Sequence, residues 1–158
     1  MRMFLFAKRN IKEILRDPIN LFFGLGFPLV LLALLSIINS AIPPEAKNTM
    51  FQINNLAPGL TMFGSVFMAL FAGMLLSKDR TSSFLMRLFT SPMTATDFIL
   101  GYSLPMIVMT IVQATITLLV AGFFGLNINI NILFAIIMTA LTSLLFVGTG
   151  LFFGSILN

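Results

Sequence analysis

The chain has 158 residues, of which 58% are hydrophobic and only 9% are charged, whereas a soluble domain is about 25% charged. This composition excludes a soluble globular protein and predicts a polytopic membrane protein. The absence of cysteine excludes disulfides and thiolate metal sites, and the absence of histidine removes the commonest general base. The net charge of +4 follows the membrane topology and does not indicate nucleic-acid binding.

Residues 1–17 are the first predicted element, an amphipathic helix that lies in the membrane interface. Its apolar residues recur at helical spacing between charged ones: Phe4, Ala7, Ile11, Ile14 and Leu15. The Asp17-Pro18 pair is expected to end the helix, because a proline disfavours helical geometry at the residue before it. Two interpretations stay open and can coexist: a simple anchor on the lipid surface, and a docking helix for a cytoplasmic partner.

Four stretches are long and apolar enough to be membrane spans, which need about 20 residues each. They are residues 19–40, 56–77, 99–124 and 132–157. Charged side chains are costly in hydrocarbon, and here they are confined to residues 2–17, 45–47 and 78–97. Lys and Arg are most numerous in the first and last of these patches, so the positive-inside rule predicts a cytoplasmic N-terminus and a cytoplasmic segment 78–97. The expected fold is an all-α, multi-pass membrane protein.

The cytoplasmic segment between spans two and three has a pattern of its own. Residues 81–90 are predicted to form a short helix with an apolar side, and Ser91-Pro92 is expected to stop it. Thr96 or Asp97 is expected to cap the next helix by accepting its free N–H groups. A segment of this length and pattern exceeds what a bare connection needs, although a simple connector is the alternative.

The sequence carries no recognisable catalytic or nucleotide-binding chemistry. No glycine-rich phosphate-binding loop is present, and no cluster of His, Cys or carboxylates could hold a metal or supply acid–base catalysis. We therefore expect no enzymatic activity within this chain. The predicted spans contain no ionisable residue, so a transport function would take its energy from outside the chain and not from an ion gradient.

Uncharged polar residues and glycines within the spans allow two interpretations. Gln113, Thr61 and Ser65 could form hydrogen bonds between helices, or they could line a translocation path for a solute. Gly150 and Gly154 form a small-xxx-small pair in the fourth span, which is typical of close helix packing.

The order of these elements resembles the permease subunits of type-2 ABC exporters. The matching motifs are Arg16-Asp17-Pro18 after the interfacial helix, Pro58-Gly59 at the start of span two, Asp79-Arg80, the short hydrophobic helix Phe84-Leu85-Met86-Arg87-Leu88, and Thr90-Ser91-Pro92. The family usually has a glycine and an acidic residue in the segment 79–92, where this chain has Ser82 or Ser83 and Met86 or Arg87. The family also usually has six spans, so the resemblance implies a chain truncated before its last two.

The resemblance implies a mechanism and a set of site residues. The segment 79–92 would be a coupling helix seated in a separate ATPase subunit that binds ATP and Mg²⁺. The coupling residues implied are Asp79, Arg80, Phe84, Leu85, Arg87, Leu88, Ser91 and Pro92. The N-terminal helix would be the connecting helix, with Lys8, Arg9, Ile11, Lys12, Ile14, Leu15 and Arg16.

The other implied features are a second permease copy, as a homodimer or heterodimer, and residence in the cytoplasmic (inner) membrane. The transported solute would be hydrophobic or amphipathic. A protein of a different class remains as the main alternative: a small membrane protein without transport activity that assembles with or regulates a membrane partner. A four-span carrier driven by an ion gradient is disfavoured by the uncharged spans.

Overall fold

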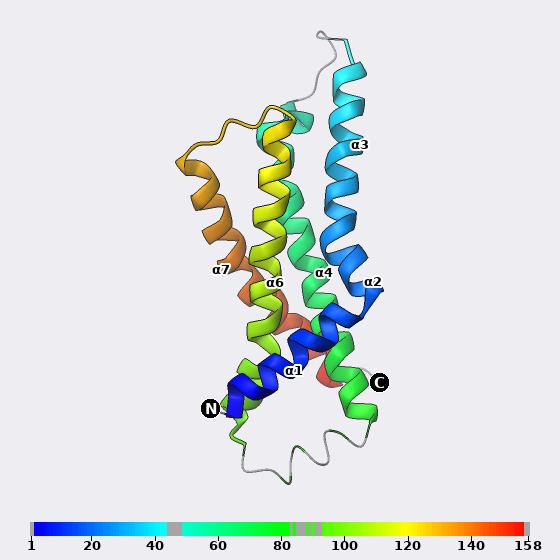
Figure 1. Cartoon of the computed structure of the whole chain (residues 1–158), viewed down its shortest axis with the longest axis vertical. Helices are drawn as coiled ribbons and strands as arrows, with labels where there is room; N and C mark the ends of the chain where they lie inside the picture. The colour runs from blue at the N-terminus through cyan, green and yellow to red at the C-terminus, as the bar shows by residue number, and fades with distance from the viewer. Residues whose placement is uncertain are drawn as a thin grey trace.

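The computed structural model describes residues 2–43, 49–82, 84, 88, 90 and 93–156. Within these residues the regular structure is helical, without strands. Four helices or helical runs are long and apolar enough to cross a membrane: Pro18–Ala41, Ile53–Thr81, Ala95–Phe123 and Ile130–Ile156. They form an elongated bundle, and the N-terminal helix lies across its lower end (Figure 1). The prediction of an all-α membrane protein with four spans is confirmed.

The N-terminal helix α1 (Arg2–Arg16) is separated from the first span by a capped turn. Asp17 leaves helical geometry, with φ −93° and ψ 106°, and its side chain accepts hydrogen bonds from the N–H groups of Ile19 and Asn20 at 3.0 and 3.4 Å. Pro18 occupies the first turn of α2 (Pro18–Leu21), where no backbone donor is needed. The Asp17-Pro18 pair thus ends one helix and starts the next at a changed direction.

The first span is a continuous helical run with a π-helical turn near its start. α2 continues through η1 (Phe22–Gly26) into α3 (Phe27–Ala41). Gly24 is buried in the π-helical turn, where a Cβ atom would collide with the side chain of Met68 on the second span. The missing side chain at Gly24 leaves the space that the end of the Met68 side chain occupies.

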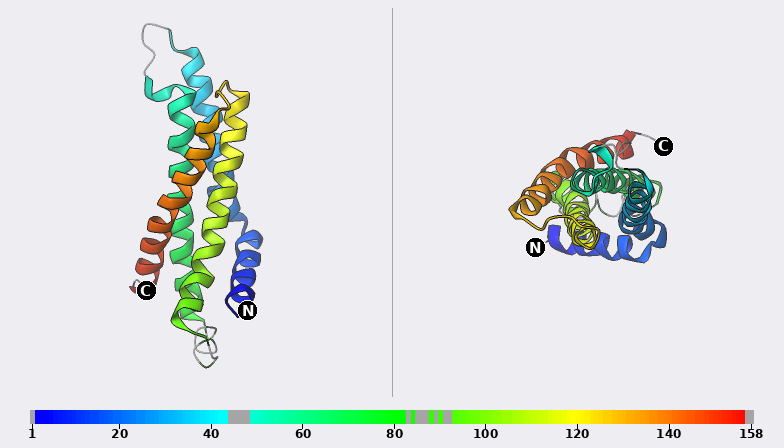
Figure 2. Two further views of the ribbon diagram at one scale, coloured as in Figure 1. Left: turned by 90° about the vertical axis from the view of Figure 1, so that its left-hand side faces the viewer. Right: turned by 90° about the horizontal axis from the view of Figure 1, so that it is seen from above.

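The remaining spans are α4 (Ile53–Thr81), which follows the short η3 (Thr49–Phe51), then α6 (Ala95–Phe123) and α7 (Ile130–Ile156). α4 packs against both α6 and α7 along the bundle, while α3 stands to one side of it (Figures 1 and 2). The outward surfaces of α3 and α7 are rich in exposed Leu, Ile and Phe, as lipid-facing helices require.

Two hydrophobic clusters hold the bundle together at different heights. One lies at the end that carries the charges and combines α1 with α4, α6 and α7; its buried members include Phe6, Ile14, Met68, Phe71, Tyr102 and Met106. The other lies toward the opposite end and contains Leu32, Ala57, Leu60, Leu118 and Ala121. We call the end with α1, the end of α4 and the start of α6 the charged end.

The helices extend beyond the apolar stretches predicted as spans. α4 continues past residue 77 through Lys78, Asp79 and Arg80 to Thr81, and α6 starts at Ala95 and not at residue 99. Hydropathy marks the hydrocarbon layer, whereas charged residues continue a helix readily outside it. Half of the helix predicted for residues 81–90 lies outside the described residues, as does Leu157 of the fourth span.

The cap of α6 differs from the expectation. Neither Thr96 nor Asp97 is the N-cap: Thr94 is, and its hydroxyl accepts a hydrogen bond from the N–H of Asp97 at 3.2 Å. The Asp97 carboxylate in turn accepts the N–H of Thr94 at 3.3 Å, which completes a capping box. The prediction was wrong because the helix begins about one turn before the apolar stretch does.

Candidate functional site

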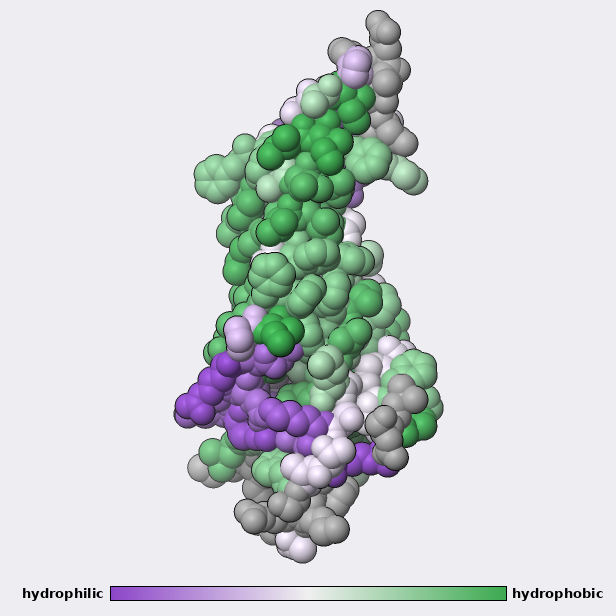
Figure 3. Space-filling model, turned by 90° about the vertical axis from the view of Figure 1, so that its right-hand side faces the viewer, coloured by the Kyte–Doolittle hydropathy of each residue, from purple (hydrophilic) through white to green (hydrophobic). Residues whose placement is uncertain are grey.

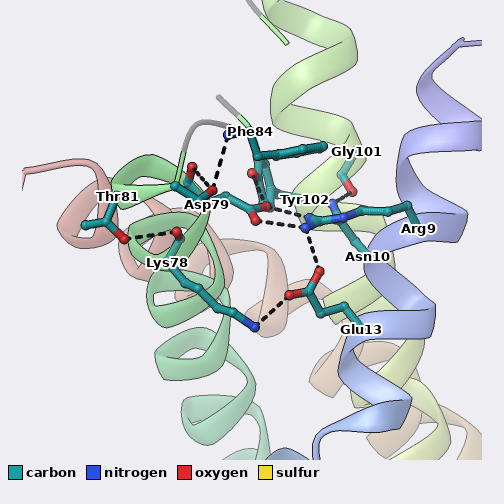
Figure 4. Close-up of polar contacts among 10 residues, drawn as sticks. Arg9, Asn10, Glu13, Lys78, Asp79, Thr81, Phe84, Gly101 and Tyr102 are labelled. Carbon is teal, nitrogen blue, oxygen red and sulfur yellow. Dashed lines mark hydrogen bonds and ion pairs between the residues drawn. The ribbon is translucent and has the colours of Figure 1, made fainter. Parts of the chain in front are cut away.

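An ion pair joins α1 to the end of α4 at the charged end. The Arg9 guanidinium donates from Nη1 to Asp79 Oδ2 at 2.5 Å and from Nη2 to Asp79 Oδ1 at 2.9 Å (Figure 4). This fork-to-carboxylate arrangement is the geometry in which Arg binds a carboxylate most strongly. Asp79 is only 2% exposed, so the pair holds a carboxylate that would be costly to bury alone.

The same carboxylate also binds the third span. The hydroxyl of Tyr102, a fully buried residue on α6, donates to Asp79 Oδ2 at 2.7 Å. Asn10, the neighbour of Arg9, donates from its side-chain amide to the carbonyl of Gly101 at 2.9 Å. A Cβ atom at Gly101 would collide with the Phe6 ring, so α1 lies directly against the α6 backbone here. We call Arg9, Asp79 and Tyr102 the latch.

Further charges surround the latch. Glu13 accepts from Arg9 Nη2 at 2.6 Å and from Lys78 Nζ at 2.8 Å, which adds a second connection between α1 and α4. Partial burial lowers the pKa of Arg9, but its hydrogen bond and charge interaction with Asp79 and the charge of Glu13 outweigh this, so the pKa is raised. The guanidinium therefore stays charged at any physiological pH. Among the described residues, no group of three or more His, Cys, Asp or Glu could hold a metal ion.

Aromatic rings enclose one side of the latch. The Phe6 ring contacts Tyr102 edge-on with ring centroids 5.0 Å apart and stacks at 6.2 Å on Phe84, a residue of the segment that follows α4. The Arg9 guanidinium lies 4.2 Å from the centroid of the Phe84 ring, within the range of a cation–π interaction. Phe84, in the segment after α4, therefore contacts Arg9, which is also the residue that joins α1 to Asp79 on α4.

The residues predicted to couple to an ATPase lie in different environments. Asp79 is buried in the latch, and Arg80 is exposed and donates to the backbone carbonyl of Ser155 on α7. Phe84 and Leu88 are half-buried against the hydrophobic cluster at the charged end. The other predicted coupling residues, Leu85, Arg87, Ser91 and Pro92, lie outside the described residues. A direct contact between Asp79 and a partner stays a prediction, but in this structure its carboxylate is occupied within the chain.

The predicted connecting helix has one face on the bundle and one face outward. Ile14 is buried, Arg9 and Ile11 are half-buried, and the exposed members of the predicted set are Lys8, Lys12, Leu15 and Arg16. Sequence reasoning missed Asn10 and Tyr102. A signal for Asn10 existed, since it lies on the same helical face as Phe6 and Ile14, where an unpaired amide would be costly.

The polar residues predicted to hydrogen-bond or to line a path are buried between α4, α6 and α7. Thr61, Ser65 and Gln113 are all 0% exposed. The hydroxyls of Thr61 and Thr139 lie 3.1 Å apart, and Gln113 Nε2 donates to Thr117 Oγ1 at 3.1 Å. The Thr61–Thr139 contact joins α4 to α7 and favours helix packing in this conformation, whereas the Gln113 bond stays within α6 and its buried Oε1 has no hydrogen-bond partner among the described residues. A role of these residues in a translocation path stays a prediction.

The glycine pair of the fourth span lies at the closest approach between α4 and α7. A Cβ atom at Gly150 would collide with the carbonyl group of Ala69, and one at Gly154 with the backbone of Gly73. In the other direction, a Cβ at Gly73 would come within 2.7 Å of the Gly150 carbonyl oxygen. Both glycines therefore pack within one chain, where they allow the two helical backbones to touch.

Comparison with known proteins gives one family. The family model described as ABC-2 type transporter matches residues 1–158. Neither the curated proteins nor the solved structures gave a match.

Proposed function

Because the chain belongs to the ABC-2 type transporter family, we propose that it is a permease subunit of an ATP-driven exporter. In this proposal a separate ATPase subunit binds ATP and Mg²⁺ and docks at the charged end, which faces the cytoplasm. A second permease copy completes the transporter in the cytoplasmic membrane. The solute is hydrophobic or amphipathic.

The latch is the observation that carries the proposal. Three elements meet at it: the interfacial helix α1, the last turns of α4 and the first turns of α6. The segment between Ser82 and Met93 connects the last two of these elements, and its Phe84 lies against Arg9. A force applied to this segment by an ATPase would therefore act on α1 and on two spans at once. A rigid, buried ion pair suits this task better than a solvated contact, because its geometry is fixed.

The placement of charge supports an external energy source. The described charged side chains lie in α1, at Asp17, in the last turns of α4 and at Asp97 in the first turn of α6. A carrier driven by protons or sodium ions usually needs an ionisable group within the membrane. Apart from Asp79 at the charged end, the fully buried polar side chains in the described parts of the spans are hydroxyls and the amide of Gln113.

An apolar groove supports the proposed class of solute. It has a volume of about 480 Å³ and runs along α4 and α7. The groove is lined mostly by apolar side chains, including Met74, Phe146 and Phe153, with Ser77 and Thr149 as its polar members. A surface of this chemistry takes up an apolar or amphipathic group in preference to an ion.

The docking of an ATPase can be tested by co-purification. The chain is affinity-purified from membranes of its source after mild crosslinking, and ATP hydrolysis in the eluate is measured. Leu85→Asp combined with Leu88→Asp should abolish the associated hydrolysis, because two buried carboxylates in an apolar contact carry a large desolvation cost. The amount of chain inserted in the membrane should not change.

A matched control uses two apolar residues at the opposite end of the bundle. Ile128→Asp combined with Ile130→Asp introduces the same chemistry at positions that are 69% and 66% exposed. This variant should retain the ATPase. Equal ATPase recovery with both double variants would contradict the docking site, and no recovery with the unmodified chain would contradict the exporter proposal.

A further inference from the structure

The outward face of α1 carries a group of cations that the latch does not use. We propose that Lys8, Lys12 and Arg16 form a binding site for the phosphate headgroup of an anionic glycerophospholipid. The inference does not rest on the proposed transport function, since it depends only on the geometry and charge of α1.

The three cations border a defined hollow. A cavity of about 760 Å³ opens between α1, the start of α2 and the end of α4, and its walls are Leu5, Lys8, Arg9, Lys12, Glu13, Arg16, Asp17, Pro18 and Lys78. Its volume is large enough for a phosphoglycerol group with its hydration. The cavity therefore offers several cations to one ligand, whereas isolated surface lysines would not.

The two acidic residues in the cavity are already engaged. Glu13 accepts from Arg9 and from Lys78, and Asp17 accepts the N–H groups that start α2. Arg9 itself is held by Asp79. Lys8, Lys12 and Arg16 form no ion pair with any residue that the structure describes. Five cationic and two acidic side chains line the cavity, so the net charge that faces it is positive.

The spacing of the three cations points to a shared anion. Residues 8, 12 and 16 are four apart, so their side chains follow one another along a single face of α1. Like charges at this spacing destabilise a helix unless an anion lies between them. A phosphate diester supplies two oxygens that the Arg16 fork can bind together, while the lysines supply point charges beside it.

The surroundings favour a lipid over a soluble phosphate. Leu5 and Pro18 line the cavity, and Leu15 and Ile19 close to it in sequence are 51% and 61% exposed. The hydrophilic patch lies directly below the hydrophobic surface of the spans (Figure 3). A phospholipid whose headgroup enters the cavity would place its acyl chains against this hydrophobic surface, whereas a free phosphate would leave it uncovered.

The test measures which lipid stays bound. The full chain is reconstituted in phosphatidylcholine vesicles with a minor fraction of phosphatidylglycerol, extracted in mild detergent, purified, and analysed for bound lipid by mass spectrometry. The wild type should retain phosphatidylglycerol enriched about tenfold over its bulk fraction, with less enrichment as salt increases. The triple variant K8Q/K12Q/R16Q should return to the bulk ratio, while K8R/K12R/R16K should remain enriched.

A second triple variant separates a defined site from a diffuse positive surface. R2Q/R80Q/R87Q removes three cations encoded outside residues 8–16 and should keep the enrichment. Helix content measured by circular dichroism checks that each variant folds. The salt dependence of phosphatidylglycerol enrichment on the wild type tests the inference without any variant. Equal loss with both triple variants, or no enrichment in the wild type, would overturn the site.

The remaining outcomes distinguish other ligands of the same surface. If soluble glycerol phosphate displaces phosphatidylglycerol at comparable concentration, the cavity recognises phosphate alone and the lipid assignment is wrong. If K8Q/K12Q/R16Q loses a co-purifying ATPase while its bound lipid is unchanged, the face binds an acidic protein surface instead.

Discussion

Replacing Asp79 by alanine should release α1 from the bundle. The carboxylate accepts two hydrogen bonds from Arg9 and one from Tyr102, at 2.5, 2.9 and 2.7 Å. Without it, a half-buried guanidinium and a buried phenol lose their common partner. The spans themselves should remain assembled, because the packing of α4 against α7 does not involve the latch.

The size of the effect follows from burial. Removing one partner of a buried ion pair costs about 3–5 kcal/mol. The Arg9 side chain is 34% exposed, so water can partly replace the lost carboxylate and the lower figure applies. A loss of about 3 kcal/mol corresponds to a roughly 100-fold increase in the population with α1 detached.

The chain has no cysteine, so one introduced thiol can report on this opening. Ile14→Cys places a smaller side chain at a position that is 2% exposed and lies on the bundle side of α1. Its rate of alkylation in purified protein follows the detached population when opening and closing are fast. Adding Asp79→Ala should raise this rate about 100-fold.

Arg80→Gln is the matched control, because it alters the adjacent charge, which contacts α7 and not α1. A rate with Asp79→Ala no greater than with Arg80→Gln would refute the latch. In the double variant Arg9→Ala/Asp79→Ala, the thiol introduced at position 14 should be alkylated more slowly than the product of the two single-variant rate increases predicts. The reason is that neither charge is then left without its partner.

Three further predictions use the same protein. Gly150→Val should lower stability by about 2–3 kcal/mol in detergent unfolding followed by circular dichroism, because its side chain meets the α4 backbone, whereas Gly148→Val, with no atom within 4 Å of its Cβ, should have little effect. Thr94→Ala should cost about 1 kcal/mol in that assay through loss of the capping box, and an equal loss with Thr96→Ala would contradict the assignment of the cap. Tyr102→Phe removes one of three hydrogen bonds to the latch carboxylate and should raise alkylation of the introduced thiol about fivefold; an unchanged rate would show that the hydroxyl does not hold α1.

The membrane architecture could be predicted because its signal is local. Long uncharged stretches define the spans wherever they occur, and a proline after an aspartate interrupts a helix whatever surrounds it. The start of α6 shows the limit of this approach. The apolar stretch begins after the helix does, so the search for a cap began too late and missed Thr94, which stands three residues before Asp97 in the spacing of a capping box.

The latch could not be predicted because it depends on which charges meet. The sequence shows that Arg9 and Asp79 both lie near the membrane boundary, but neither their pairing nor the burial of Asp79 follows from hydropathy. The contact of Asp79 with an ATPase therefore stays a prediction, while its two contacts within the chain, with Arg9 and Tyr102, were not foreseen. The lone tyrosine of the chain was overlooked, although a phenol at the start of an apolar span needs a hydrogen-bond partner.

The distance along the chain between the latch residues has a consequence for biogenesis. Arg9 is synthesised 70 residues before Asp79, and Asn10 is synthesised 91 residues before Gly101. The N-terminal helix therefore has no latch partner until the second span is made, and its contacts are incomplete until the third span has begun. Docking of α1 is then a late step of membrane insertion. It can succeed only if the second span ends, and the third span begins, on the same side of the membrane as α1.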